Sequence, residues 1–70
     1  MTMIGVESSD LRSVGYDAAT SRLVIEFKSG GTYEYFDVPL QVFTGLLSAD
    51  SKGKYFHANI RERFRYHKIG

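Results

Sequence analysis

The sequence predicts a small α+β protein, in which a three-stranded antiparallel sheet is followed by two helices packed on one face. Apolar residues alternate with a period of two between residues 11 and 36, as in half-buried strands. After residue 37 they recur at helical spacing. The chain has 70 residues, 43% of them hydrophobic, so it is expected to form one domain with a small core. Residues 1–10 contain few apolar positions and are expected to be loosely ordered.

Three strands are expected at residues 11–17, 22–28 and 32–36. The second has the clearest pattern, because Leu23, Ile25 and Phe27 share one face. The glycine pair after Ser29 supplies the positive φ values that a tight hairpin needs. Residues 18–21 are expected to form the turn between the first two strands, where Asp17 can accept hydrogen bonds from the backbone NH groups that follow it. Short connections of this kind make an antiparallel meander the simplest topology.

Two helices are expected next, at about 39–49 and 53–63. Pro39 suits the first helical position, where its missing NH costs nothing. The apolar stripe of this first helix consists of Leu40, Phe43, Leu46 and Leu47. Gly45 lies inside the same helix, where glycine costs about 1 kcal/mol relative to alanine, so it is expected to mark a close contact.

The second helix is expected to begin after Ser51, which is a good N-cap. Its buried stripe consists of Phe56, Ile60 and Phe64, which lie four residues apart. Residues 64–69 fit a helix end, a strand or a tail, and we expect a short, extended basic tail.

Charge is divided unevenly along the chain. Residues 51–70 carry six basic residues and one acid, whereas residues 1–50 carry three basic residues and seven acids. The two parts therefore have net charges of +5 and −4, which give the total of +1. A basic end that also contains aromatic residues indicates a polyanionic partner. On a helix, one basic stripe would be formed by Lys54, His57, Arg61, Arg65 and Lys68.

The motifs along the chain resemble those of the KTSC domain, a small bacterial module named after the C-terminus of lysyl-tRNA synthetases. The matching segments are Val6-x-Ser8-Ser9, Gly15-Tyr16-Asp17, Leu23-x-Ile25-x-Phe27, Gly30, Tyr33-Glu34-Tyr35, Val38-Pro39, Ala49-x-Ser51-x-Gly53-x-Tyr55-Phe56 and Ile60-Arg61. They span nearly the whole chain in order. The resemblance implies a stand-alone copy of this domain, for which RNA binding has been suggested.

The resulting expectation is a non-catalytic module that binds RNA or tRNA through its basic C-terminal helix and tail. The expected contact residues are Lys52, Lys54, Arg61, Arg63, Arg65, Tyr33 and Tyr35. Lys52 and Lys54 also flank a Ser/Gly turn at a helix start, which is a reasonable anion site. The alternative is a protein-interaction module that uses a free sheet edge or an aromatic face.

Tyr33 and Tyr35 have two possible roles, which depend on strand register. They lie two apart on one strand and therefore point to the same side. If that side faces the helices, they belong to the core; if it faces solvent, they can stack on bases. In the second case Phe36 and Thr32 would face the core instead.

Enzymatic and metal-dependent functions have little support in the sequence. The chain has no cysteine, and its two histidines lie ten residues apart without a metal-binding motif. We therefore expect no catalytic residues, no metal and no cofactor. No stretch is long and apolar enough to cross a membrane, and nothing reads as a signal peptide, so a cytoplasmic protein is expected.

Overall fold

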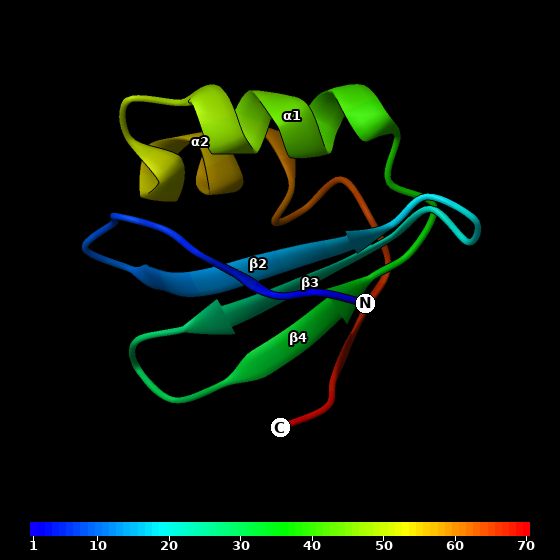
Figure 1. The fold of residues 1–70 in the computed structure, drawn as a ribbon, viewed down its shortest axis with the longest axis horizontal. Coiled ribbons are helices and arrows are strands. Elements are labelled where there is room, and N and C mark those ends of the chain that lie inside the picture. Colours follow the sequence, from blue (N-terminus) through cyan, green and yellow to red (C-terminus); the bar gives the residue numbers. More distant parts are fainter.

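The computed structural model describes residues 1–70 and has two layers, a five-stranded antiparallel sheet and two helices on one of its faces (Figure 1). The strands are β1 (Ile4–Gly5), β2 (Leu11–Asp17), β3 (Arg22–Phe27), β4 (Thr32–Tyr35) and β5 (Tyr66–Lys68), and the helices are α1 (Leu40–Ser48) and α2 (Lys52–Asn59). The strands lie in the order β1-β2-β3-β4-β5. The α+β class is confirmed, and the number of strands is corrected from three to five.

The three central strands lie close to their expected positions. β2 has the expected bounds, whereas β3 and β4 each end one residue earlier. In the turn between β3 and β4, Gly30 has a φ of +113°, so glycine is required there as expected. In the turn before β3, the Oδ1 atom of Asp17 accepts a hydrogen bond from the NH of Ala19 at 3.0 Å. The hydrogen bond of Asp17 and the positive φ of Gly30 are thus confirmed, whereas Gly31, the second glycine of the pair, does not have a positive φ.

The two additional strands extend the meander at both edges. In β1, Ile4 pairs with Val14 of β2, although it lies in the segment expected to be loosely ordered. In β5, Tyr66 pairs with Tyr35 of β4, which places a strand in the stretch that sequence left open. The three-stranded prediction missed both, because β1 lies in a stretch with few apolar positions and the pattern around β5 fits a helix end or a tail as well as a strand.

A β-bulge near the start of β2 sets which of its residues face the core. The pairing of β2 with β3 shifts register between Leu11 and Ser13. As a result Leu11 and Val14 both lie opposite core-facing residues of β3 and are fully buried, although they are an odd number of residues apart. The bulge explains why the alternation of this strand is weak in the sequence.

The core lies between the sheet and the helices. It is formed by Leu11, Val14, Leu23, Ile25, Tyr35, Val38, Leu46, Phe56 and Ile60. Neither helix has the length and apolar character that crossing a membrane would require.

α1 begins one residue later than expected, and Pro39 is its N-cap, with φ −62° and ψ 149°. Leu46 of this helix is fully buried, and Phe43 stacks on Tyr16 with ring centroids 5.0 Å apart. The expected apolar stripe is wrong at Leu40, which is 53% exposed in the first turn. The first turn of α1 lies where the chain leaves the sheet, and the helix packs against the core only in its later turns, which contain Leu46.

Gly45 marks a close helix contact, as expected. A Cβ atom at Gly45 would lie 2.8 Å from the Cζ atom of Tyr55 on α2. Glycine therefore lets the tyrosine ring pack directly on the α1 backbone.

α2 begins at Lys52, one residue before the expected start, and Ser51 is its N-cap as expected, because the Ser51 side chain accepts a hydrogen bond from the NH of Lys54 at 3.3 Å. It ends at Asn59, four residues earlier than expected. The Asn59 side chain donates to the carbonyl oxygen of Tyr55, and such bonds favour helix ends. Ile60 then leaves helical geometry, with φ −123° and ψ −50°, and its side chain is fully buried.

The early end of α2 overturns the expected basic stripe. Lys54 and His57 lie on the helix, Arg61 lies in the turn that follows it, Arg65 directly precedes β5, and Lys68 lies on β5. These five residues therefore do not share one helix face.

Candidate functional site

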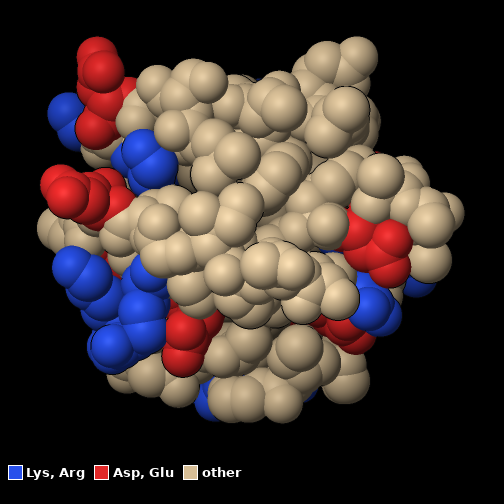
Figure 2. All heavy atoms as spheres, viewed as in Figure 1, with Lys and Arg blue, Asp and Glu red and all other residues tan.

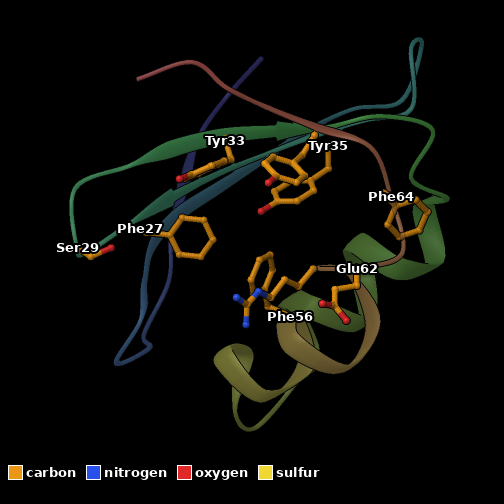
Figure 3. A pocket seen from close by; sticks show the side chains of 9 residues that line it. Phe27, Ser29, Tyr33, Tyr35, Phe56, Glu62 and Phe64 are labelled. Carbon is orange, nitrogen blue, oxygen red and sulfur yellow. The ribbon is translucent and has the colours of Figure 1, made fainter.

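A pocket of about 640 Å³ lies between the sheet and the C-terminal end of α2 (Figure 3). We call it the aromatic pocket, because most of its lining side chains are aromatic. It is lined by Phe27, Ser29, Tyr33, Tyr35, Phe56, Arg61, Glu62, Phe64 and Tyr66. Three of these, Tyr33, Tyr35 and Arg61, are among the expected contact residues, and the structure brings them together.

Strand register places the tyrosines in this pocket. Leu23 and Ile25, both core residues of β3, pair with Tyr35 and Tyr33 of β4. Residues that pair directly share a face, so both tyrosines point toward the helices and the open question of register is settled. Tyr35 is 4% exposed, whereas Tyr33 is only half-buried. They are therefore part of the inner face of the sheet, and they also line a pocket on that face.

The walls of the aromatic pocket are held by edge and tilted ring contacts. Phe56 of α2 meets Phe27 at 5.1 Å and Tyr35 at 5.8 Å between ring centroids, both edge-on. Tyr66 lies 5.8 Å from Tyr33 and 5.9 Å from Tyr35. Such pairs each contribute about 0.5–1.5 kcal/mol beyond burial, so the rings support one another without a ligand.

Tyr35 contributes an unpartnered hydroxyl group to the pocket. The tyrosine hydroxyl that hydrogen-bonds within the protein is that of Tyr16, which donates to the carbonyl oxygen of Val38. Figure 3 shows the Tyr35 ring extending from β4 into the space between the sheet and α2. Burial raises the pKa of Tyr35 to about 12, nearby Tyr33 and Tyr66 add to the rise, and Arg61 opposes it. Near neutral pH the hydroxyl is therefore uncharged and can both donate and accept a hydrogen bond.

Arginine side chains border the pocket on the turn after α2. Arg61 lines the pocket, and its guanidinium lies 3.4 Å from the Nδ1 atom of His57. A neighbouring hollow is lined by Arg63 and Arg65 and shares three residues with the aromatic pocket, namely Glu62, Phe64 and Tyr66. The three arginines therefore lie along one continuous surface, which we call the arginine rim.

Arg65 is partly engaged within the protein. Its guanidinium carbon lies 5.5 Å from the centre of the Phe36 ring, and one of its nitrogens lies 3.5 Å from the Asp37 carboxylate. Both charged side chains are about 80% exposed, so this ion pair is worth little and a stronger anion can replace it.

The two expected lysines lie apart from the aromatic pocket, at the start of α2. Lys52 donates a hydrogen bond from its Nζ atom to the carbonyl oxygen of Ala49, so it serves the end of α1. Lys54 is exposed. A Cβ atom at Gly53 would meet the Asp10 carboxylate, so an acid of the protein itself already faces this helix start. The expected anion site is thereby disfavoured.

The charge distribution on the face seen in Figure 1 is mixed. Figure 2 shows Lys and Arg beside Asp and Glu at its edges and an uncharged centre. This face therefore offers no surface of one sign.

Sequence reasoning missed Phe27, Ser29 and Glu62 as lining residues and assigned Phe56 and Phe64 to the core alone. Whether these residues line a pocket depends on the space between the sheet and α2 in three dimensions, and a local sequence pattern does not predict that space. The sequence did contain a pattern that could have placed Tyr66 in the pocket. Its alternation with His67 fits a strand whose Tyr66 side chain lies on the same face of the sheet as Tyr33 and Tyr35.

Comparisons with known proteins agree with the motifs described above. The profile of the KTSC domain matches residues 7–64. A lysine–tRNA ligase from Trichormus variabilis is 44% identical over 63 residues, which are 90% of this chain and 11% of the ligase. The chain thus spans only about a tenth of the ligases it matches. An uncharacterized protein from Stutzerimonas stutzeri is 41% identical over 70 residues and 99% of both chains.

A solved structure has the same fold over its whole length. The crystal structure of a KTSC domain protein from Yersinia pestis matches with a TM-score of 0.96 and 39% identity, covering 99% of this chain and 97% of that one. The five-stranded arrangement is therefore shared with an experimentally determined structure.

Proposed function

The chain belongs to the KTSC domain family, and we propose that it is a non-catalytic module that binds single-stranded RNA, including exposed strands of tRNA, in the cytoplasm. The observation that carries the proposal is the contact of the aromatic pocket with the arginine rim. Aromatic rings stack on bases, and guanidinium groups pair with phosphates, so one surface offers partners for both parts of a nucleotide. Similarity to part of enzymes named as lysine–tRNA ligases supports RNA as the polyanion.

The proposed interface assigns different roles to the expected residues. Arg61, Arg63 and Arg65 contact the phosphate backbone, and Tyr33 and Tyr35 lie beneath it in the aromatic pocket. The exposed Lys54 adds a peripheral charge one turn before His57 on α2. Lys52 contributes least, because its ammonium group already binds the end of α1.

A non-catalytic role fits the chemistry of the pocket. A nucleophile or general base needs a pKa matched to neutral pH, whereas burial moves that of Tyr35 to about 12. This hydroxyl is suited to hydrogen bonding rather than to proton transfer.

A protein partner has weaker support. Strand addition needs a free edge, and the edge strands β1 and β5 have only two and three residues. Lys68 lies on β5 and further discourages pairing with another strand.

The test is a salt titration of the binding of a short single-stranded RNA, followed by fluorescence anisotropy. Each phosphate neutralised contributes about 0.7 to the slope of log affinity against log salt for single strands. We expect a slope of about −2 from the three arginines, and Arg61→Gln should reduce it by about 0.7.

Arg12→Gln is the matched control, because it removes the same charge from an exposed residue outside the pocket. It should leave the slope unchanged. Equal losses for the two variants, or affinity that does not depend on salt, would contradict the proposal.

A further inference from the structure

The aromatic pocket offers more volume and more apolar lining than contacts with a phosphate backbone require. Backbone contacts need only exposed cations, as on the arginine rim. A volume of about 640 Å³ lies instead within the roughly 300–1,000 Å³ of pockets that enclose small molecules. The pocket is thus suited to a chemical group that leaves the strand and enters the protein.

The lining favours a planar, uncharged group. Six of the nine lining residues are hydrophobic, and the rings of Phe56 and the tyrosines surround the space. Arg61 and Glu62, in the same lining, carry opposite charges, so the lining has no net charge that would select an ion. An unstacked nucleobase has the flat apolar faces that aromatic side chains cover, and it carries no charge.

The Tyr35 hydroxyl offers a hydrogen-bonding group to a ligand in the pocket. Its residue is 4% exposed, and the hydroxyl has no partner among protein groups, unlike that of Tyr16. Because the hydroxyl is not sealed off from the pocket, a ligand there can hydrogen-bond to it in place of water. The edges of nucleobases carry donors and acceptors, and this hydroxyl can serve either.

We propose that the aromatic pocket holds one unstacked base of the single strand, with its edge at the Tyr35 hydroxyl and the adjoining phosphate at Arg61. The inference rests on the proposed function and deepens it. The arginine rim provides affinity that does not depend on sequence, and the pocket provides recognition of an unpaired nucleotide. Tyr66, 60% exposed at the mouth, covers the outer side of the base.

The test compares a tetranucleotide RNA with an abasic tetranucleotide that has the same ribose–phosphate chain and therefore the same charge. A fully abasic strand cannot offer a base by shifting its register. Stacking on aromatic side chains predicts that the base-bearing strand binds about fivefold or more tightly than the abasic strand.

Two variants test whether the difference in affinity between the two strands arises in the aromatic pocket. Tyr66→Leu keeps an apolar side chain at an exposed position and should abolish most of the preference for the base-bearing strand. Tyr35→Phe removes only the hydroxyl and should weaken the binding of the base-bearing strand by about two- to tenfold, without affecting the abasic one. The matched control is Tyr55→Phe, which removes a hydroxyl outside the pocket and should leave both affinities unchanged.

The outcomes separate the two proposals. Equal, salt-dependent affinity for both strands would overturn base insertion and leave the RNA-binding function in place. A preference for bases that survives in Tyr66→Leu and Tyr35→Phe would also overturn base insertion, because the base would then bind elsewhere. Absence of salt-dependent binding of either strand would overturn both proposals.

Discussion

Tyr35 on β4 pairs directly with Tyr66 on β5, and their ring centroids lie 5.9 Å apart on the helix face of the sheet. The first ring is buried and the second is 60% exposed, so the pair runs from the core to the mouth of the aromatic pocket. This pairing depends on β5, the strand formed by the basic end of the chain. β5 therefore completes one edge of the sheet, and its Tyr66 completes the pocket lining.

Tyr35 should titrate separately from the other tyrosines. Its pKa is about 12, against an ordinary value of about 10, because burial disfavours the charged phenolate. Tyrosinate absorbance, measured against pH in the folded protein, should show a late step that is missing in Tyr35→Phe. An unchanged titration curve in that variant would contradict the burial of this hydroxyl.

Stability should depend on the same proton at high pH. The folded pKa of Tyr35 lies above the unfolded value, so the stabilisation it contributes is fully present below about pH 10 and decreases as the pH rises toward about 12. Urea unfolding across this range should show a smaller loss for Tyr35→Phe than for the wild type. A loss of the same size in both proteins would exclude a linkage to this group.

The ring of Tyr35, rather than its hydroxyl, should stabilise the fold. Removing a buried aromatic ring costs about 3–5 kcal/mol, which is a large part of the stability of a domain this small, so Tyr35→Ala should be strongly destabilised. Tyr35→Phe should change the free energy of unfolding by less than about 1 kcal/mol, because no protein group loses a hydrogen bond. Denaturant titrations of the two variants provide the comparison.

Gly45 and Tyr55 should be strongly coupled. Gly45→Ala improves helix propensity by about 1 kcal/mol, but the new methyl group would collide with the Tyr55 ring. The substitution should therefore destabilise the wild type and stabilise a Tyr55→Ala background. A double-mutant cycle measures this coupling, and additive effects would show that the helices do not meet at this point.

β5 should contribute to the stability of the whole domain. A chain that ends at Arg65 loses the pairing of Tyr66 with Tyr35 and leaves the inner tyrosines uncovered. In a domain of this size each kcal/mol lost lowers Tm by about 4–8 °C, so thermal unfolding should detect the truncation easily. An unchanged Tm would mean that the fifth strand adds nothing to the sheet.

Local pattern was enough to predict the parts of the fold that have strong signals. The alternation of Leu23, Ile25 and Phe27, the turn glycine Gly30 and the Ser51 cap each act over a few residues. The end of α2 was mistaken because Arg61 to Phe64 continue a helical spacing, while the burial of Ile60 in the core decides where the chain turns. Tertiary packing overrode the local pattern there.

The candidate site was predictable in composition but not in arrangement. Tyr33, Tyr35 and Arg61 were expected contact residues, and they meet because the register of β4 and the turn after α2 bring them together. The same reasoning could not separate Lys52 from Arg61, since an early helix end and a bond to Ala49 distinguish them only in three dimensions.

An NMR titration of the whole chain with a short single-stranded RNA at low and high salt tests the central proposal most directly. We expect the amides of Tyr33, Tyr35 and residues 61–66 to shift at low salt and to return toward their free positions at high salt. Shifts confined to the start of α2 around Lys54, or no shifts at low salt, would contradict an RNA site at the aromatic pocket.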